Sequence, residues 1–236
     1  MPGHAARGRR NRRSSGQHFL GSARLAAQLV ADADVGDADR VVELGAGRGI
    51  LTGALARQAA HVLAVELDPE LARVLARRFA TTRNVVVLPA DARDVPLPCN
   101  PYRVVANLPF GVTSAVLRRL LDAPDTGLMR ADLVVQWQVA RERVRVDHGP
   151  TTDLVGARWG PWWEFLRGRR LPAGSFRPRP SVDAAVLVVA RRDPPLLPVE
   201  WSRRYANFVT RAFRSRPDAP DLGIRHWVAR FCGAER

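Results

Sequence analysis

Short apolar segments alternate with longer amphipathic segments along most of the chain. Runs rich in β-branched residues and bounded by Gly, Pro, Asp or Asn have the length of buried strands, whereas apolar residues at every third or fourth position are typical of helices. The pattern predicts strands at 40–44, 61–65, 85–88, 103–106, 133–135 and 184–190. It predicts helices at 22–33, 50–59, 69–79, 114–121 and 138–146. Strands and helices in this alternation indicate an α/β fold with a parallel sheet.

Residues with useful chemistry stand where four of these strands end. The loop Gly45-Ala46-Gly47-Arg48-Gly49 follows the first strand, Glu66 ends the second, Asp91 follows the third and Asn107 ends the fourth. Open α/β sheets bind ligands at the carboxyl ends of their strands. We therefore expect these four features to lie along one edge of the sheet.

The glycine loop and the acids after it favour a nucleoside ligand. Glycines let the backbone approach a ligand closely, and the following helix offers unpaired N–H groups. Glu66 stands about where nucleotide-binding α/β units place a ribose-binding carboxylate, and Asp91 suits an exocyclic adenine amine unless it only caps a turn. The Gly-x-Gly-x-Gly spacing is neither the dinucleotide fingerprint nor a P-loop. An adenosine without pyrophosphate fits better, and S-adenosylmethionine is the commonest cofactor of this kind.

The tetrapeptide Asn107-Leu108-Pro109-Phe110 brings an amide, a rigid proline and an aromatic ring to one strand end. This combination suits a flat, hydrogen-bonding base. The alternative is an ordinary turn with Phe110 in the core, and for the tetrapeptide alone that reading is favoured. Because the tetrapeptide stands in a row of strand ends that carry candidate binding residues, we favour base binding over an ordinary turn.

The charge balance favours a polyanionic partner. The 236 residues include 37 basic and 23 acidic ones, a net charge of +14, and every basic residue is arginine. Guanidinium groups pair with phosphates bidentately and stack on bases. A GC-rich genome would also enrich arginine, and a membrane surface is the weaker alternative partner. The hydrophobic content of 46% is sufficient for a full α/β domain with a smaller appendage.

Cysteine usage and the lack of long apolar runs favour a cytoplasmic protein. Cys99 and Cys232 are too few and too widely separated for a disulfide framework or a zinc site. The basic N-terminus is not followed by an apolar signal segment, and no run approaches the ~20 apolar residues of a membrane span. We expect neither a membrane nor a metal partner. Pro98-Cys99 resembles the nucleophile motif of cytosine C5 methyltransferases, but it precedes the fourth strand, so we interpret it as incidental.

The chain divides into three parts by composition. Residues 1–15 form a flexible basic arm, residues 16–192 the main domain, and residues 193–236 a small helical domain with helices at 200–214 and 221–231. Residues 176–180 form a stiff basic loop. For the aromatic cluster we favour packing under the sheet over base stacking; its members are Trp159, Trp162, Trp163 and Phe165.

Several motifs resemble those of a known family, the ribosomal RNA adenine N6-methyltransferases. This family comprises small-subunit dimethyladenosine transferases and erythromycin-resistance (Erm) enzymes, and the resemblance covers residue 16 to about residue 192. Residues 17–20, Gln-His-Phe-Leu, are similar to the family's N-terminal motif, 43–49 to its cofactor loop, and 65–68 to its ribose-binding strand end. Residues 135–140 and 160–165 look more like Erm enzymes than their housekeeping relatives.

The resemblance implies a Rossmann-like S-adenosylmethionine-dependent methyltransferase domain with a small helical RNA-binding domain. It implies a monomer that modifies an adenine of 23S rRNA and gives resistance to macrolides, lincosamides and streptogramin B. The implied cofactor-binding residues are Gln17, His18, Leu20, Gly45, Gly47, Glu66, Leu67, Asp91, Ala92 and Asn107. The implied catalytic residues are Asn107, Leu108, Pro109 and Phe110.

Two features depart from the family pattern: His18 replaces an asparagine, and the C-terminal segment is short. The Asn107 oxygen and a backbone carbonyl of Leu108 or Pro109 would accept the two N6 hydrogens of adenine, while Phe110 stacks on the extruded base. No general base and no metal are required. Two alternatives stay open: a small-subunit 16S rRNA dimethyltransferase, and a non-catalytic nucleic-acid-binding module on the same scaffold.

Overall fold

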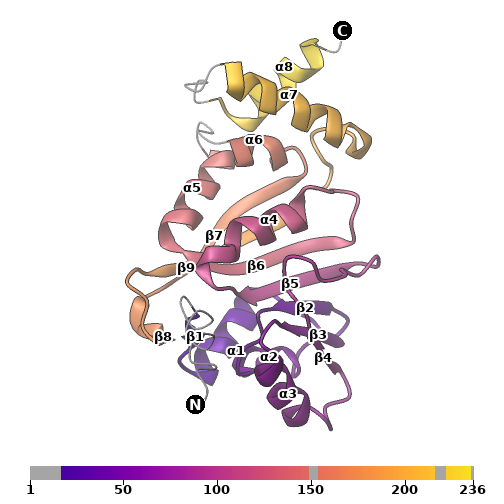
Figure 1. Ribbon diagram of the computed structural model, residues 1–236. Helices are drawn as coiled ribbons and strands as arrows, with labels where there is room; N and C mark the ends of the chain where they lie inside the picture. Colours follow the sequence, from indigo (N-terminus) through magenta and orange to yellow (C-terminus); the bar gives the residue numbers. More distant parts are fainter. Residues whose placement is uncertain (1–16, 149–153, 216–221, 235–236) are drawn as a thin grey trace, which may run out of the picture.

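The computed structural model describes residues 17–148, 154–215 and 222–234, so the predicted basic arm lies outside the described residues. This part of the chain forms a seven-stranded sheet with the order β4-β3-β2-β5-β6-β9-β7 (Figure 1). The strands in chain order are β2 (Arg40–Leu44), β3 (His61–Glu66), β4 (Val85–Pro89), β5 (Tyr102–Asn107), β6 (Leu128–Gln136), β7 (Trp163–Leu171) and β9 (Ala184–Arg191).

Five neighbouring strands, from β4 to β6, run parallel, and β9 and β7 close the sheet in antiparallel pairings. The parallel strands are built of Val, Leu and Ala, because helices cover both faces of the sheet and both sides of each inner strand are buried. The predicted α/β fold with a parallel sheet is therefore confirmed.

Two helical layers cover the sheet. Buried residues of α1 and α2 join one apolar cluster and Leu75 of α3 packs on the same face, whereas α4, α5 and α6 contribute to the larger cluster on the opposite face. The first layer contains α1 (Ala23–Asp32), α2 (Ile50–Leu55) and α3 (Pro69–Arg78). The second contains α4 (Thr113–Leu121), α5 (Trp137–His148) and α6 (Leu154–Trp159). None of the helices that the structure describes is long and apolar enough to cross a membrane.

The helices α7 (Ser202–Ser215) and α8 (Ile224–Ala234) stand at the top of the molecule, next to α6 (Figure 1). Their buried side chains belong to the same apolar cluster as Trp159 and Trp162 of the main body. The Tyr205 hydroxyl donates a hydrogen bond of 3.0 Å to the Ala157 carbonyl. The C-terminal helices are thus packed against the α/β unit.

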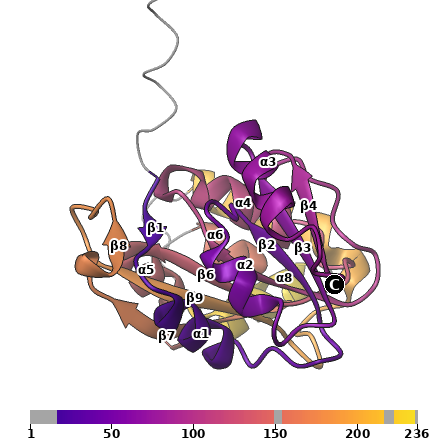
Figure 2. The same ribbon diagram turned by 90° about the horizontal axis from the view of Figure 1, so that it is seen from below.

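A second, two-stranded sheet joins two distant segments. β1 (Phe19–Leu20) pairs antiparallel with β8 (Phe176–Arg177). In Figure 2 this pair lies on the side of the molecule opposite β4. Three 3-10 helices complete the described elements: η1 (Phe110–Val112), η2 (Ala173–Ser175) and η3 (Val199–Trp201).

The structure corrects three expectations and adds a strand that was not predicted. The helix predicted over 50–59 ends at Leu55, where turns lead back into β3, and the strand predicted over 133–135 extends over 128–136. The loop expected at 176–180 begins with β8. β7 was not predicted, because its exposed, arginine-rich second half hides the alternation of a strand. The predicted packing role of Trp159, Trp162, Trp163 and Phe165 is confirmed by their burial.

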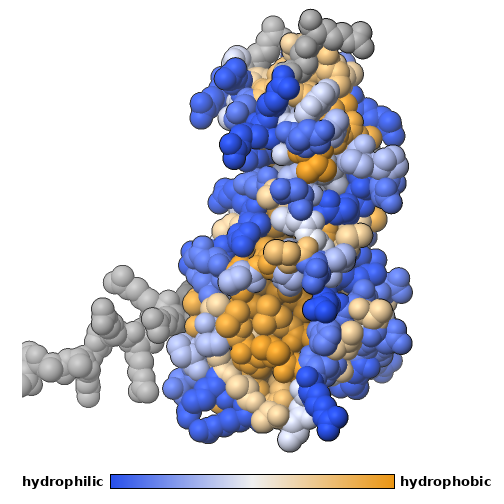
Figure 3. Space-filling view, turned by 90° about the vertical axis from the view of Figure 1, so that its right-hand side faces the viewer, coloured by the Kyte–Doolittle hydropathy of each residue, from blue (hydrophilic) through white to orange (hydrophobic). Residues whose placement is uncertain are grey.

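Apolar side chains are exposed beside the sheet edge formed by β4. Val86 of that strand is 62% exposed, and so is Leu67, which follows β3. Figure 3 shows apolar residues gathered on the lower half of one face, the half that contains β2, β3 and β4 in Figure 1. Leu67 also lines the pocket described next.

Candidate active site

A pocket of about 840 Å³, its mouth included, lies at the carboxyl ends of β2, β3, β4 and β5. All ten residues expected to bind the cofactor line it: Gln17, His18, Leu20, Gly45, Gly47, Glu66, Leu67, Asp91, Ala92 and Asn107. Leu108 and Pro109 also line it, whereas Phe110 does not. The predicted alignment of the four strand ends along one sheet edge is confirmed.

The glycine loop forms one wall of the pocket. Gly45 and Gly47 have φ values of +78° and +56°, in the left-handed region that favours glycine. A Cβ atom on Gly47 would lie 2.9 Å from the Phe19 ring. The amides of Gly45 and Ala46 both donate to the Val65 carbonyl at 2.9 Å. The loop is therefore fixed against β3 and the N-terminal motif.

Glu66 is held as a preorganised acceptor. Its side chain is buried, and its two oxygens accept hydrogen bonds from the backbone N–H of Gly47 at 2.7 Å and of Asp68 at 2.9 Å. A carboxylate has about four acceptor positions, so two remain for hydroxyl donors. This arrangement fits a ribose at the end of β3.

Glu43 is a pocket residue that the candidate set from the sequence did not include. It is fully buried in β2, lines the pocket and accepts a hydrogen bond of 2.6 Å from the Thr52 hydroxyl. Burial raises the pKa of its carboxyl to about 8, against the smaller lowering effect of Thr52. One signal in the sequence could have identified Glu43 as a pocket residue: it is a glutamate within an apolar strand, directly before the glycine loop.

Glu43 should make stability depend on pH. Its pKa is raised from 4.5 in the unfolded chain to about 8 in the fold, so the native state keeps a proton that the unfolded state releases. The contribution of Glu43 to the free energy of unfolding is complete below pH 4.5 and is lost as pH rises through 8. The loss is at most about 1.4 kcal/mol per pH unit. We expect Glu43→Gln to remove this loss, as measured by urea unfolding between pH 5 and 8. An equal pH slope in both proteins would contradict this.

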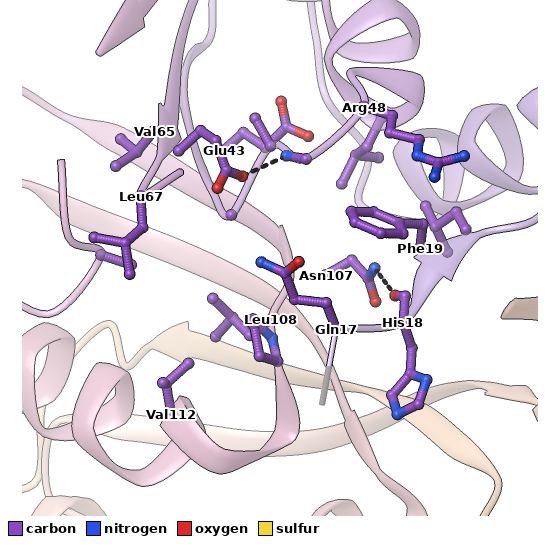
Figure 4. Close-up of a pocket in the computed structure, with 18 of the residues that line it drawn as sticks. Gln17, His18, Phe19, Glu43, Arg48, Val65, Leu67, Asn107, Leu108 and Val112 are labelled. Atoms are coloured by element: carbon purple, nitrogen blue, oxygen red, sulfur yellow. Dashed lines mark hydrogen bonds between the residues drawn. The ribbon is translucent and has the colours of Figure 1, made fainter. Parts of the chain in front are cut away.

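Asn107 is oriented by the backbone of the N-terminal motif. Its Nδ2 donates a hydrogen bond of 2.8 Å to the His18 carbonyl oxygen (Figure 4). A carbonyl oxygen only accepts, so this contact fixes which end of the amide is nitrogen. No residue that the structure describes donates to Oδ1. Asn107 therefore presents an acceptor at the end of β5 without having to rearrange.

The His18 ring points away from the Asn107 amide (Figure 4). Its Nδ1 lies 2.8 Å from the Pro178 carbonyl oxygen, so Nδ1 carries the proton and donates. The ring also lies 5.6 Å from the Phe110 ring. Across the pocket the Arg48 guanidinium stacks over Phe19 at 5.0 Å. His18 thus contacts the loop after β8 through its ring and Asn107 through its backbone carbonyl.

Asp91 is an ionised acceptor that is already shared. Its carboxylate accepts from the Arg93 backbone N–H and from Arg93 Nε, both at 2.9 Å. The hydrogen bond from the Arg93 side chain lowers the pKa of Asp91 below its usual value, mainly against the raising effect of burial. An adenine amine at this position would share the carboxylate with Arg93.

Cys99 is not among the residues that line this pocket. Cys99 is exposed and precedes β5, so it lies at the end of that strand opposite Asn107. Within the described ranges, no three His, Cys, Asp or Glu side chains form a group suited to a metal ion.

The chain matches a known protein family over most of its length. The ribosomal RNA adenine dimethylase family matches residues 8–218 of the 236. The chain belongs to this family. The resemblance inferred from the motifs is confirmed at that level, and the fold class with it.

Individual family members cover most of the chain. It is 35% identical to an rRNA adenine N-6-methyltransferase of Corynebacterium diphtheriae, over 87% of the chain and 78% of that protein. It is 39% identical to the mycinamicin-resistance protein MyrB of Micromonospora griseorubida, over 86% of the chain and 63% of that protein. Two further relatives are spanned over only 52% and 59% of their length.

Among solved structures, the crystal structure of the 23S rRNA methyltransferase ErmE matches with a TM-score of 0.75 and 30% sequence identity. The match covers 85% of this chain and 80% of ErmE. The fold described above is thus one that is found in rRNA methyltransferases.

Proposed function

We propose that this protein transfers a methyl group from S-adenosylmethionine to N6 of an adenine in 23S rRNA, and that this gives resistance to macrolides, lincosamides and streptogramin B. The observation that carries the proposal is the Asn107 amide, which is fixed by the His18 carbonyl and has a free acceptor at the end of β5. The relatives MyrB and ErmE support the choice of substrate and outcome.

The pocket suits the cofactor. The buried Glu66 carboxylate can accept ribose hydroxyls, the ionised Asp91 can accept the adenine amine, and the exposed Leu67 offers an apolar surface for the adenine ring. A Cβ atom on Gly45 would point toward Asn107 and Leu108, so this glycine keeps the space between the loop and the end of β5 open for the methionine part. When bound, S-adenosylmethionine supplies an electrophilic methyl group.

Asn107 and its neighbours activate the nucleophile. Adenine N6 is a poor nucleophile because its lone pair is delocalised into the ring. Two acceptors for the N6 hydrogens favour tetrahedral geometry and direct the lone pair toward the methyl group. Asn107 Oδ1 is one acceptor. The Pro109 carbonyl already accepts from the Val112 N–H at 3.0 Å, so we assign the second role to the Leu108 carbonyl.

Phe110 takes the role of a stacking platform for the extruded base. Phe110 is the first residue of η1 and follows Asn107, Leu108 and Pro109 in the chain. Its ring is partly buried against apolar neighbours. Stacking on an aromatic side chain contributes roughly 1–3 kcal/mol per base. The His18 ring beside Phe110 supports it from the side of β8.

The remaining parts of the chain supply RNA contacts in this proposal. The C-terminal part, residues 193–236, bears exposed arginines on both of its helices: Arg203, Arg204, Arg211, Arg214, Arg225 and Arg230. The arm of residues 1–15 is rich in arginine as well, and its role in RNA binding follows from its charge alone. We propose a cytoplasmic monomer.

The substrate assignment is tested with naked 23S and 16S rRNA and a labelled methyl donor. We expect label in 23S rRNA at N6 of adenine, mapped by mass spectrometry. Label confined to 16S rRNA would identify a small-subunit dimethyltransferase instead. Cofactor binding without label in either RNA would identify a non-catalytic module. Erythromycin susceptibility of cells that express the protein or its Asn107→Ala variant tests the resistance.

A further inference from the structure

The edge strand β7 contains an irregularity that groups two arginines. Arg167 pairs with Leu187 of β9 and Arg170 with Ala185, so the register advances by three residues on β7 and by two on β9. In a regular strand, residues three apart point to opposite faces. The extra residue of a bulge places both arginines on the same face.

Both guanidinium groups lie over one aromatic ring. The Cζ atoms of Arg167 and Arg170 are 5.0 and 4.8 Å from the centroid of the Trp137 ring, at the start of α5. The ring is partly buried against the larger apolar cluster. Arg169, between them in sequence, instead pairs with Asp32 of α1 at 2.9 Å, in the opposite helical layer. We call Trp137, Arg167 and Arg170 the arginine–tryptophan cluster.

The cluster carries more positive than negative charge. Arg170 donates a hydrogen bond of 2.8 Å to Asp183, whose other oxygen accepts from the Ala173 N–H. Arg167 is exposed and forms no ion pair with any residue that the structure describes. Two cations on one ring repel each other, and a bound anion relieves that repulsion. Guanidinium groups bind phosphate oxygens bidentately.

The cluster is at the same end of the parallel strands as the catalytic motif. Asn107 of β5 pairs with Val134 of β6, and Trp137 directly follows the last residue of β6. The Trp137 N–H donates to the Asp183 carbonyl at 3.0 Å, just before β9 begins. In Figure 1, α5 starts where the ends of β6 and β9 meet, on the same side of the sheet as α4. An RNA strand with one base at Asn107 would pass this surface with its neighbouring nucleotides.

We propose that the arginine–tryptophan cluster binds the ribose-phosphate backbone of the substrate RNA beside the target adenine, with Trp137 holding the two guanidinium groups in place. This inference rests on the proposed function, because it assumes an RNA substrate. Phosphate contacts fix the register of a nucleic acid without reading its sequence. The cluster therefore contains positioning residues that do not touch the reacting atoms.

The test compares Arg167→Gln/Arg170→Gln with Arg169→Gln, a matched control in the same strand that faces the other layer. Binding of a naked 23S rRNA transcript is measured by fluorescence anisotropy over a range of salt concentrations. We expect the double variant to bind about tenfold or more weakly, with a slope of log K against log salt that is smaller by about 1 to 2. The control should keep wild-type affinity and slope.

Methyl transfer gives a second readout. The double variant should raise KM for RNA and leave kcat at saturating RNA close to wild type, and Arg167→Lys/Arg170→Lys should restore most of the salt slope. A lowered Tm with unchanged RNA affinity and slope would overturn the inference and make the cluster a structural link between β7 and α5. The binding measurement does not need methyl transfer, so it decides this inference even if wild type fails to methylate 23S rRNA, a result that would instead refute the proposed function.

Discussion

Replacing Asn107 with alanine is expected to abolish methyl transfer, lowering kcat at least about 1000-fold, or roughly 4 kcal/mol. In the proposed mechanism the substitution removes the acceptor that directs the N6 lone pair, and the Leu108 carbonyl alone cannot accept both hydrogens. Cofactor affinity should stay within about tenfold, roughly 1.4 kcal/mol, because Glu66 and Asp91 are untouched. Single-turnover transfer and calorimetric titration with S-adenosylmethionine measure the two effects separately.

A second substitution tests the orientation of the amide. Asn107→Asp keeps an acceptor oxygen but loses the N–H that donates to the His18 carbonyl. We expect activity between that of wild type and of the alanine variant, because the carboxylate is repelled by that carbonyl.

Normal turnover in Asn107→Ala would contradict the role that we propose for this side chain.

Replacing Glu66 with alanine is expected to weaken S-adenosylmethionine binding about 100-fold, roughly 2.7 kcal/mol. The carboxylate accepts from two backbone amides and shapes the glycine loop, so its removal leaves the N–H groups of Gly47 and Asp68 without an acceptor and releases the pocket wall. Glu66→Gln should also bind weakly, since an amide offers one acceptor where two donors converge. Calorimetry measures both affinities.

The matched control is Glu70→Gln, four residues further along. Glu70 is exposed and pairs with Arg73 on the surface of α3. Surface ion pairs contribute little, so cofactor affinity should not change. Wild-type affinity in Glu66→Gln would mean that the carboxylate does not hold the loop.

The central sheet and the pocket edge could be predicted from sequence because their signals are local. Strand β2 and the loop after it combine a β-branched run with glycines whose positive φ values the structure shows. The convergence of Glu66, Asp91 and Asn107 followed from the rule that parallel strands share a carboxyl edge. These features can be predicted without knowing which residues that are far apart in the sequence contact each other.

Features that depend on distant partners escaped prediction. β7 has five consecutive exposed residues, so it lacks the alternation of a strand, and only its pairing with β9 defines it. β1 and β8 contain two residues each and are strands only because they meet. The hydrogen bond that orients Asn107 is accepted by the His18 backbone carbonyl, and because every residue has such a carbonyl, the sequence gives no sign of this contact. Glu43 belongs to the motif at residues 43–49, but its raised pKa could not be predicted because it depends on the burial of the side chain in the fold.

The pairing of β1 with β8 also sets when the pocket can be completed during synthesis. The His18 ring is held by the Pro178 carbonyl, 160 residues further along the chain. Until residues up to Pro178 have left the ribosome, the N-terminal motif has no strand to pair with, and His18 cannot be held where its carbonyl meets Asn107. Closing so long a loop is entropically unfavourable and depends on the intervening sheet. The pocket wall formed by the N-terminal motif is therefore completed only after residue 178 has been synthesised.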